Sequence, residues 1–438
     1  MHRLDASLST DLNVADETDA RILMTDYYAA LSELIRPISA AALPQTIEPV
    51  RHLLAALGSP EQQFPAVIVT GSVGKGTAAH HLARLLRAAG LRVGLYTSPH
   101  LHSFRERFQI DGQLIEPAVF SAQAGAVLAA AQDHDHSTHE LSTALALRWF
   151  AEQRVEIGVL EVSIGGRFDA VNAAHGRLAL ITPIELEHAA MLGGTLQSIA
   201  WHKAGVIRPC GAAISAPQVD SVAAVLAAEA QSVGAALLIV DDAAELALSA
   251  YAWLRAEGGF SGLPAHPPVL EAEMLPGRLE IVAISGKTFI IDGGHTPRAA
   301  ARLRAAIDAR APSDVLIVVG MLRDKDACAY LAALDRPRTH LMLTRAPGDR
   351  ALEAGELGAR WSPLHARVSI QPSLEAALHS AASAQQDLVV ICGSLRMAAA
   401  ARMALGLLPE DLHAEAIATQ KLFEGDAYRA KLAGRSAR

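Results

Sequence analysis

A glycine-rich stretch between an apolar run and an amphipathic helix carries the clearest chemical signal in the sequence. The stretch AVIVTGSVGKGT ends at Thr77 and places Gly71, Gly74 and Gly76 around Lys75. Glycines let backbone N–H groups approach phosphate oxygens, a lysine supplies a point charge, and a hydroxyl can hold Mg²⁺. The positive end of the following helix would add to the same site. The stretch therefore predicts a site for a nucleoside triphosphate.

The stretch departs from the standard phosphate-binding pattern at two points. The pattern G-x-x-x-x-G-K-[ST] would have a glycine in place of Val69, and here Gly76 separates Lys75 from Thr77. A tight strand-to-helix turn beside an ordinary surface lysine would contain similar glycines. The loop alone favours phosphate binding over such a turn by about two to one.

Metal-competent side chains follow two further apolar runs. Glu161 ends IGVLE, and Glu187 and His188 follow LALITPI. The carboxyl ends of parallel strands share one edge of a sheet, which is where open α/β sheets bind ligands. Carboxylate and hydroxyl oxygens suit Mg²⁺, and an imidazole is a less usual ligand. A helix cap or solvated strand end for Glu161, and a hydrogen-bonded structural role for His188, are the alternatives left open.

The elements that must position these residues alternate between apolar runs and helical periods. Residues 66–98 are typical of a strand–helix–strand unit, which implies a parallel sheet with a right-handed crossover. The alternation continues to about residue 240, and a second series starts near residue 288. We predict an α/β fold with a large P-loop-type mononucleotide-binding domain, built on a parallel sheet, and a smaller Rossmann-like C-terminal domain.

Composition shifts divide the chain. The first residues are polar and acidic, and proline and glycine are dense over 258–278. We therefore expect a flexible N-terminal tail (1–20), a first domain (21–283) that contains the predicted nucleotide site, and a second, C-terminal domain (284–438).

Bulk properties exclude several classes of protein. The net charge of −8 gives no general attraction for nucleic acid or anionic membranes, and no stretch is long and apolar enough to span a bilayer. Cys210, Cys328 and Cys392 lie far apart without disulfide or zinc spacing. We expect a cytoplasmic protein with neither nucleic-acid nor membrane partners.

A second cluster of titratable residues, DHDHSTHE, covers 133–140. Closely spaced histidines and acids could bind a metal ion. We favour a solvated loop running into a helix by about four to one, because such tracts are only compositional evidence.

Several motifs occur in an order that resembles one known family. They are GSVGKGT, LYTSPHL, LEVSIGGRFDAVN, EHAAMLGGTLQSIAWHKAGVIRP, LPGRLE, IIDGGHTP and RDKD. This ordered set is similar to the folylpolyglutamate synthase / dihydrofolate synthase enzymes, a branch of the Mur ligase superfamily. The resemblance covers residues 25–425 and implies an ATP-dependent ligase that adds L-glutamate to dihydropteroate or reduced folates through an acyl phosphate.

The resemblance also implies roles for individual residues. The positions implied in catalysis are Lys75, Lys203 and His295, where Lys203 matches a lysine that becomes carbamylated. The positions implied in ATP binding are Gly71, Gly74, Lys75, Gly76, Thr77, Arg278 and Asp292. The positions implied for Mg²⁺ are Thr77, Glu161, His188 and carbamylated Lys203. The positions implied on the pterin side are Ser98, Pro99, His100, Phe168, Asp169 and Asn172.

Four departures from the family pattern bear on the substrate. Val73 replaces an asparagine in the loop, Ser163 a glycine, Glu187 an aspartate, and Thr296 stands in DGGHTP where DGAHNP is usual. They leave open a paralogue that uses a different carboxylate, and a nucleotide-binding protein without ligase turnover. The implied cofactors are ATP and Mg²⁺, a role for a monovalent cation such as K⁺ stays open, and we expect a monomer acting on small molecules.

Overall fold

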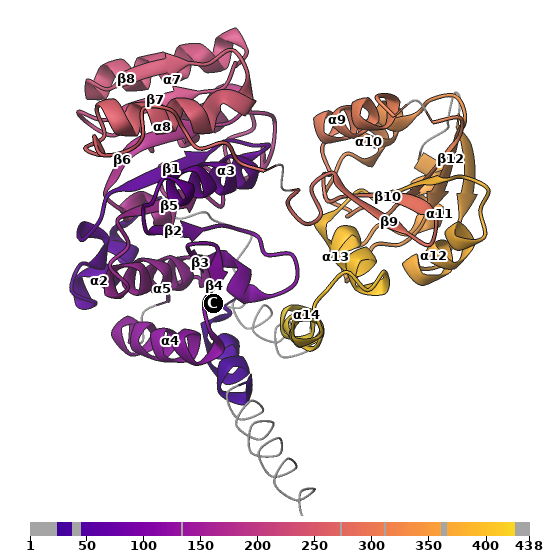
Figure 1. Cartoon of the computed structure of the whole chain (residues 1–438), viewed down its shortest axis with the longest axis horizontal. Coiled ribbons are helices and arrows are strands. Elements are labelled where there is room, and N and C mark those ends of the chain that lie inside the picture. The colour runs from indigo at the N-terminus through magenta and orange to yellow at the C-terminus, as the bar shows by residue number, and fades with distance from the viewer. Residues whose placement is uncertain are drawn as a thin grey trace, which may run out of the picture. The chain divides into compact units, whose positions relative to one another are not determined.

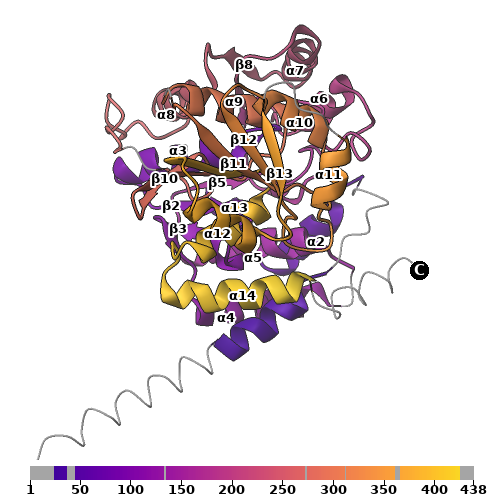
Figure 2. The ribbon, with the colours of Figure 1, turned by 90° about the vertical axis from the view of Figure 1, so that its right-hand side faces the viewer.

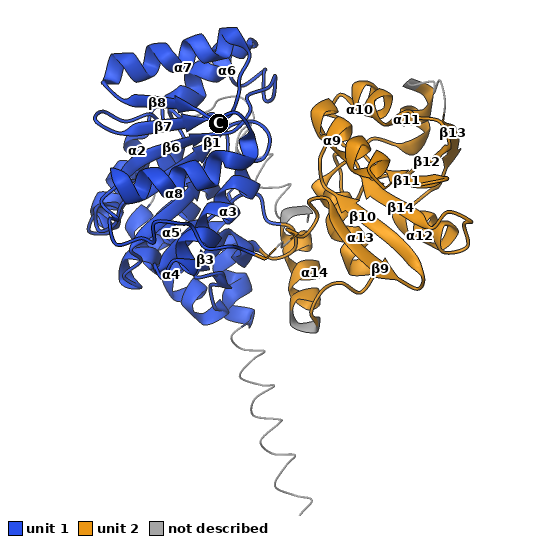
Figure 3. Cartoon of the chain, turned by 45° about the horizontal axis from the view of Figure 1, so that its top comes forward, with its two compact units in different colours: residues 1–100, 104–270, 425–438 blue, residues 101–103, 271–424 orange. Residues whose placement is uncertain are grey.

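The chain, as a computed structural model, is described over residues 24–36, 45–132, 135–271, 274–310, 312–360 and 366–424. It forms two compact units, coloured blue and orange in Figure 3. The second unit comprises 271–424 together with the short segment Leu101–Ser103, and the first holds the rest of the described residues. The tail predicted over 1–20 lies outside the described residues. No helix within the described ranges combines the length and apolarity needed to cross a bilayer.

The first unit is built on an eight-stranded sheet in the order β4-β3-β2-β5-β1-β6-β7-β8. The neighbours from β2 to β8 run parallel, and β3 and β4 extend the edge beside β2 as antiparallel strands. The strands are β1 (Ala66–Thr70), β2 (Val93–Tyr96), β3 (Phe108–Ile110), β4 (Gln113–Leu114), β5 (Ile157–Glu161), β6 (Gly176–Ile181), β7 (Ala212–Ser215) and β8 (Ala236–Ile239).

Helices cover both faces of this sheet (Figure 1). On one face, α3 and α8 share a buried apolar cluster with alternate residues of the central strands. On the other face, Gly94 of β2 lies so close to Phe150 of α5 that a Cβ would be 2.7 Å from the ring. The helices after the segment 24–34 are α2 (Glu48–Ala56), η1 (Pro60–Gln62), α3 (Lys75–Ala88), η2 (Phe104–Arg107), α4 (Pro117–Ala131), α5 (Thr138–Glu152), η3 (Ala170–Ala173), α6 (Leu196–Ala204), α7 (Asp220–Val233), η4 (Ala243–Glu245) and α8 (Leu246–Ala256).

The second unit is built on a six-stranded sheet in the order β13-β12-β11-β14-β10-β9, in which only β9 is antiparallel to its neighbour. Helices α9 and α10 bury one face, and α12 and α13 bury the other (Figure 2). The strands are β9 (Glu280–Ile284), β10 (Lys287–Asp292), β11 (Val315–Val319), β12 (Thr339–Leu343), β13 (Arg367–Ile370) and β14 (Leu388–Cys392). The helices are α9 (Pro297–Asp308), α10 (Ala327–Leu334), α11 (Ala354–Arg360), α12 (Leu374–Ala382), α13 (Leu395–Ala404) and α14 (Glu410–Glu424).

The two sheets confirm the predicted α/β class with a large and a smaller parallel-sheet unit. The compact second unit starts at Glu271, upstream of the division proposed near residue 283. The reason is β9, which pairs with β10 as a hairpin and so belongs to the second sheet.

Candidate functional site

The glycine loop leaves the first sheet at its centre. Strands β2 to β5 lie on one side of β1, and β6 to β8 lie on the other. The strand order therefore reverses at β1, and the carboxyl ends of strands at such a switch point form the usual ligand site of open α/β sheets. Every residue of β1 is buried, so the loop starts from a rigid support.

The base of this loop is tightly packed and its tip is open. Gly71 has a φ of 136°, and a Cβ there would lie 2.0 Å from the Thr182 hydroxyl at the end of β6. The Ser72 hydroxyl accepts the Glu185 N–H at 3.0 Å, which ties the base to the segment after β6. Gly74 has a φ of 88° and would meet nothing within 4 Å. The tip can therefore receive a ligand while the base stays fixed.

Helix α3 starts at this tip without a side-chain cap. Its N-cap is Gly74, whereas Thr195 caps α6 with a hydroxyl that accepts a backbone N–H. An uncapped start leaves the first N–H groups and the positive end of the helix dipole for an anion. Lys75 is half-buried with its Nζ 3.4 Å from the Ser72 carbonyl, and Thr77 is exposed on the first turn.

Lys203 reaches the base of the loop from α6. It is 3% exposed, and its Nζ donates to the Gly71 carbonyl at 2.6 Å. Burial, and then the charge of Lys75, lower the pKa of Lys203 to about 7. A large fraction of this amine is therefore neutral near pH 7, which is its nucleophilic form.

Glu161 links the glycine loop to the segment that follows β2. It ends β5 as the register partner of Val69 and is buried. Its carboxylate accepts the Ser98 N–H at 3.0 Å. A Cβ on Gly76 would lie 3.4 Å from Glu161 Oε2, so this carboxylate faces the first turn of α3 directly.

His188 lies in the segment after β6, in a left-handed conformation with a φ of 54°. Its Nε2 is 3.8 Å from Glu187 Oε1. In the described part of the chain, no three His, Cys, Asp or Glu side chains gather closely enough to hold a metal ion unaided. Mg²⁺ in nucleotide sites takes one or two carboxylates together with phosphate oxygens. The donor set therefore fits a metal that arrives with a nucleotide.

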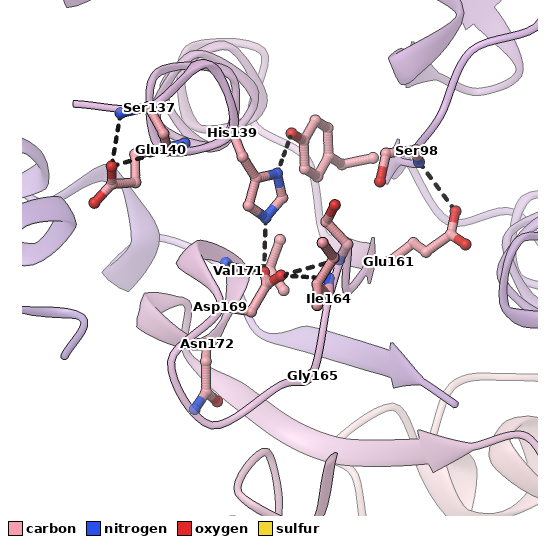
Figure 4. A network of polar contacts seen from close by, with 12 residues as sticks. Ser98, Ser137, His139, Glu140, Glu161, Ile164, Gly165, Asp169, Val171 and Asn172 are labelled. Carbon is pink, nitrogen blue, oxygen red and sulfur yellow. Dashed lines mark hydrogen bonds and ion pairs between the residues drawn. The ribbon is translucent and has the colours of Figure 1, made fainter. Parts of the chain in front are cut away.

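Asp169 organises a second loop, Ser163–Asn172, after β5 (Figure 4). Its Oδ2 accepts the N–H groups of Ser163 at 3.0 Å and Ile164 at 3.2 Å. Its Oδ1 accepts the Val171 N–H at 3.0 Å and His139 Nε2 at 2.8 Å. A carboxylate has about four acceptor positions, and all of those on Asp169 are occupied by the protein itself.

The other residues predicted on the pterin side lie on two segments of the first unit. Phe168 packs its ring against Trp201 at 6.0 Å, and Asn172 is buried with its amide donating to the Gly205 carbonyl at 3.0 Å. Ser98 and Pro99 follow β2, and the Nδ1 of the next residue, His100, accepts from Arg107 Nε at 3.1 Å.

In the second unit, Asp292 ties two turns together. It ends β10, is fully buried, and accepts the N–H of Gly294 at 2.9 Å and of Leu279 at 2.9 Å. The turn before β9 carries Arg278, and the turn after β10 carries His295, both half-buried. Asp292 therefore fixes the backbone that presents these two side chains.

Sequence patterns give little indication of several residues at these loops. Ser72 sits among glycines, where a small polar residue is a usable signal for a loop anchor. Thr182 and Tyr96 are hydroxyl-bearing residues of apolar runs with no distinguishing spacing. His139 belongs to the tract 133–140, of which residues 133–134 lie outside the described ranges. Its described part does run into a helix, α5, through a capping box at Ser137.

A parallel sheet with an uncapped glycine loop at its switch point is the arrangement of an α/β nucleotide-binding protein, and here a second α/β unit follows it in the chain. The family model described as "Mur ligase, glutamate ligase domain" matches residues 277–395.

Whole-chain comparisons narrow this class. The folylpolyglutamate synthase of Lacticaseibacillus casei is 31% identical over 405 residues, covering 81% of this chain and 92% of that protein. A Yersinia pestis bifunctional folylpolyglutamate synthase/dihydrofolate synthase, solved with AMPPNP and Mn ion, has a TM-score of 0.74 and 30% identity over 84% of this chain and 95% of its own. Escherichia coli FolC with DHPP and ADP has a TM-score of 0.75 and 28% identity, covering 87% and 98%. The chain belongs to the folylpolyglutamate synthase / dihydrofolate synthase family, as its motifs predicted.

Proposed function

We propose that this protein is an ATP- and Mg²⁺-dependent ligase of folate biosynthesis and one-carbon metabolism. It adds L-glutamate to dihydropteroate, to reduced folates, or to both. The observation that carries the proposal is the convergence of Lys203 and Glu161 on the glycine loop that starts α3. In a member of this family, that set supports phosphate activation of a carboxylate.

In the proposed reaction, a carboxylate oxygen of the acceptor attacks the γ-phosphorus of ATP. An O–P bond forms as the bond to the ADP oxygen breaks, which gives an acyl phosphate. The amine of glutamate then attacks the acyl carbon, loses a proton and releases inorganic phosphate. Phosphoryl transfer depends mainly on positioning and charge neutralisation, and Lys75 and the N–H groups of Gly74 and Gly76 are proposed to supply both.

Residues of the first unit are proposed to hold the metal. Mg²⁺, when bound with the nucleotide, would neutralise charge on the β- and γ-phosphates. Glu161, His188 and Thr77 are the proposed positions, with Lys203 if its amine carries a carbamate. The lowered pKa of Lys203 supports that modification, because the neutral amine can form an N–C bond to CO₂ and release a proton.

Each unit is proposed to carry one part of the substrate set. The first unit is proposed to bind ATP, and the second unit is proposed to bind glutamate. Arg278 and Asp292 are proposed to take part in ATP binding and His295 in catalysis, and Asp292 accepts backbone N–H groups from the two turns that carry the other two residues. The pterin end of the acceptor is proposed to lie against Ser98, Pro99, His100, Phe168, Asp169 and Asn172.

We also propose a cytoplasmic enzyme that works as a monomer. All three cysteines lie in the described ranges, and none takes part in a disulfide. This is consistent with a reducing compartment.

The central test measures ADP release by purified protein with ATP and Mg²⁺. We expect release that requires both L-glutamate and dihydropteroate or a reduced folate. If no pteroate or folate supports release, the proposed acceptor is wrong.

A second candidate is a family paralogue that joins an amino acid to a different carboxylate. Val73 in the loop, Ser163 beside Asp169, and Glu187 before His188 favour it, since each departs from the usual family residue near the site. Complementation of a strain lacking dihydrofolate synthase separates the two. Rescue supports the first candidate, and failure of well-expressed protein supports the second.

A further inference from the structure

Gln218 lies in the short segment between β7 and α7, and its side chain reaches back to the end of β6. Its Oε1 accepts the Ile184 N–H at 3.0 Å, and its Nε2 donates to the Thr182 carbonyl at 3.2 Å. Nε2 also donates to the hydroxyl of Ser215, the last residue of β7, at 3.1 Å. One side-chain amide therefore joins the end of β7 to the segment that follows the neighbouring strand β6.

The partners of this amide fix its orientation. A backbone N–H only donates and a carbonyl only accepts, so the Ile184 N–H faces the oxygen of Gln218 and the Thr182 carbonyl faces its nitrogen. The Ser215 hydroxyl donates to the Ala216 carbonyl at 2.8 Å, which leaves its oxygen to accept from Gln218. The oxygen and both N–H groups of the amide are therefore used within the protein.

The segment after β6 is held from both sides, because β6 lies between β1 and β7 in the sheet. On the β1 side, the Ser72 N–H donates to the Pro183 carbonyl at 2.9 Å. The Ser72 hydroxyl bonds both the N–H and the carbonyl of Glu185. On the β7 side, Gln218 holds the alternate residues of the same stretch. The base of the glycine loop and Gln218 therefore grip one segment between them.

Loss of the Gln218 amide would leave buried backbone groups without the partners it supplies. Thr182 is 2% exposed and Ile184 is 6% exposed. A buried N–H that loses its acceptor is costly, so the segment would shift toward water to satisfy it. The bonds from Ser72 to this segment would shift with it, and so would His188, which lies further along the same segment.

We propose that Gln218 is a positioning residue that sets affinity for ADP with Mg²⁺ by holding the segment Thr182–His188. The inference rests on the proposed function, because His188 is assigned there to the metal and the loop Gly71–Gly76 to the phosphates. Gln218 acts through the backbone of this segment and need not touch the ligand. The loop Ser163–Asn172 follows β5, on the other side of β1, so the fit of the acceptor should not depend on Gln218.

Two substitutions at Gln218 test the amide. Gln218→Met keeps the length of the side chain and removes its three hydrogen bonds. Gln218→Glu keeps an oxygen for the Ile184 N–H but sets a second oxygen against the Thr182 carbonyl. Calorimetry on the purified full chain measures the Kd for ADP in the presence of Mg²⁺. In both variants we expect this Kd to rise about tenfold, and the KM for dihydropteroate to stay within about twofold of the wild-type value.

Amide hydrogen exchange of Ile184 and Glu185 gives a readout independent of turnover and of any ligand. We expect faster exchange at both positions in the two Gln218 variants, and either variant decides the question if the other does not fold. Gln371→Met is the matched control, because the Nε2 of Gln371 donates to the Ser380 hydroxyl at 3.1 Å in the second unit. It should leave both the Kd and the exchange rates at their wild-type values.

Two results would overturn the inference. One is an unchanged Kd for ADP and unchanged exchange in the Gln218 variants. The other is an equal loss for ADP and for dihydropteroate, which indicates a general folding role. If the wild-type protein releases no ADP with any pteroate or folate, the proposed acceptor fails separately. The calorimetry and the exchange rates still decide whether Gln218 positions the segment.

Discussion

Two loops that leave neighbouring strands of the first unit are built in opposite ways. After β1, Gly71–Gly76 is anchored at its base, and its tip starts α3 without a side-chain cap. After β5, Ser163–Asn172 closes around Asp169, whose carboxylate accepts four hydrogen bonds from the protein. The first loop leaves backbone N–H groups for a ligand to accept from. In the second loop, the Asp169 carboxylate already accepts its hydrogen bonds from the protein.

This difference separates two ways of binding. A loop whose backbone N–H groups lack acceptors can donate them to an anion, so the affinity of the loop for a ligand depends directly on the ligand's charge. A loop whose polar groups are already paired presents a fixed shape, so its affinity depends on how well that shape is held. Substitutions at the open tip of the first loop should therefore mainly alter chemistry, whereas substitutions in the second loop should alter stability and substrate fit.

The largest effect is expected at Lys75. Lys75→Ala removes the one cationic side chain at the start of α3, and kcat for ADP release should fall by about 10²–10³-fold with little change in stability. Lys287→Ala is the matched control, because its Nζ donates to the carbonyls of Ala384 and Gln386 in the second unit. If Lys75→Ala keeps the wild-type kcat, the Lys75 charge does not contribute to phosphoryl transfer.

The contrast between base and tip can be tested by paired glycine substitutions. In Gly71→Ala the new Cβ would lie 2.0 Å from the Thr182 hydroxyl and 2.7 Å from its backbone oxygen, so we expect a loss of about 3 kcal/mol in the free energy of unfolding. Gly74→Ala has open space and only the left-handed backbone to oppose it, so the loss should be about 1 kcal/mol. Urea unfolding measures both, and equal losses would mean that the tip is as packed as the base.

The stability of the loop Ser163–Asn172 should depend on the Asp169 carboxylate. Asp169→Asn replaces one acceptor oxygen by a donor that faces backbone N–H groups, and we expect a loss of about 2 kcal/mol. Asp242→Asn is a control at an exposed cap, where one oxygen accepts only the Ala244 N–H at 3.0 Å, and should lose less than about 1 kcal/mol. Thermal unfolding compares them, and similar midpoints would argue against a special role for Asp169.

Counted per pH unit, the smallest effect is a pH dependence from Lys203. Its pKa is about 7 in the folded chain, against 10.5 for an ordinary lysine, so the unfolded state binds more protons between these two pH values. The free energy of unfolding of the metal-free protein should therefore rise with pH from 7 to about 10, by about 1 kcal/mol per unit at most. Lys203→Met should lose this component of the slope. An identical slope in both proteins would show that the amine is not buried in this way.

Local features of the fold were predictable, and long-range ones were not. The alternation of apolar runs and helical periods predicts β1, α3 and β2, because each follows from neighbouring residues. The short strands β3 and β4 and the half-exposed β9 escape such patterns. Strand order also depends on contacts that periodicity does not encode.

The same division applies to the site. Family motifs supplied Lys203 as a candidate, although a lysine near the end of a helix is ordinarily solvated. Its bond to Gly71 spans 132 residues, and no local pattern indicates it. His139 lies in a tract whose composition favours a simple loop, and only the fold brings it to Asp169.

Because Gly74 is the N-cap of α3, a bound nucleotide can supply the hydrogen-bond acceptors that a capping side chain would otherwise supply. When an anion occupies the first turn, it takes the place that a serine or threonine side chain fills at other helices. Folding and occupancy are then thermodynamically linked, and a nucleotide at 100 times its Kd would add about 2.7 kcal/mol to the stability of the unit that binds it. The abundance of the folded protein in a cell would in this way follow the supply of its own phosphate donor.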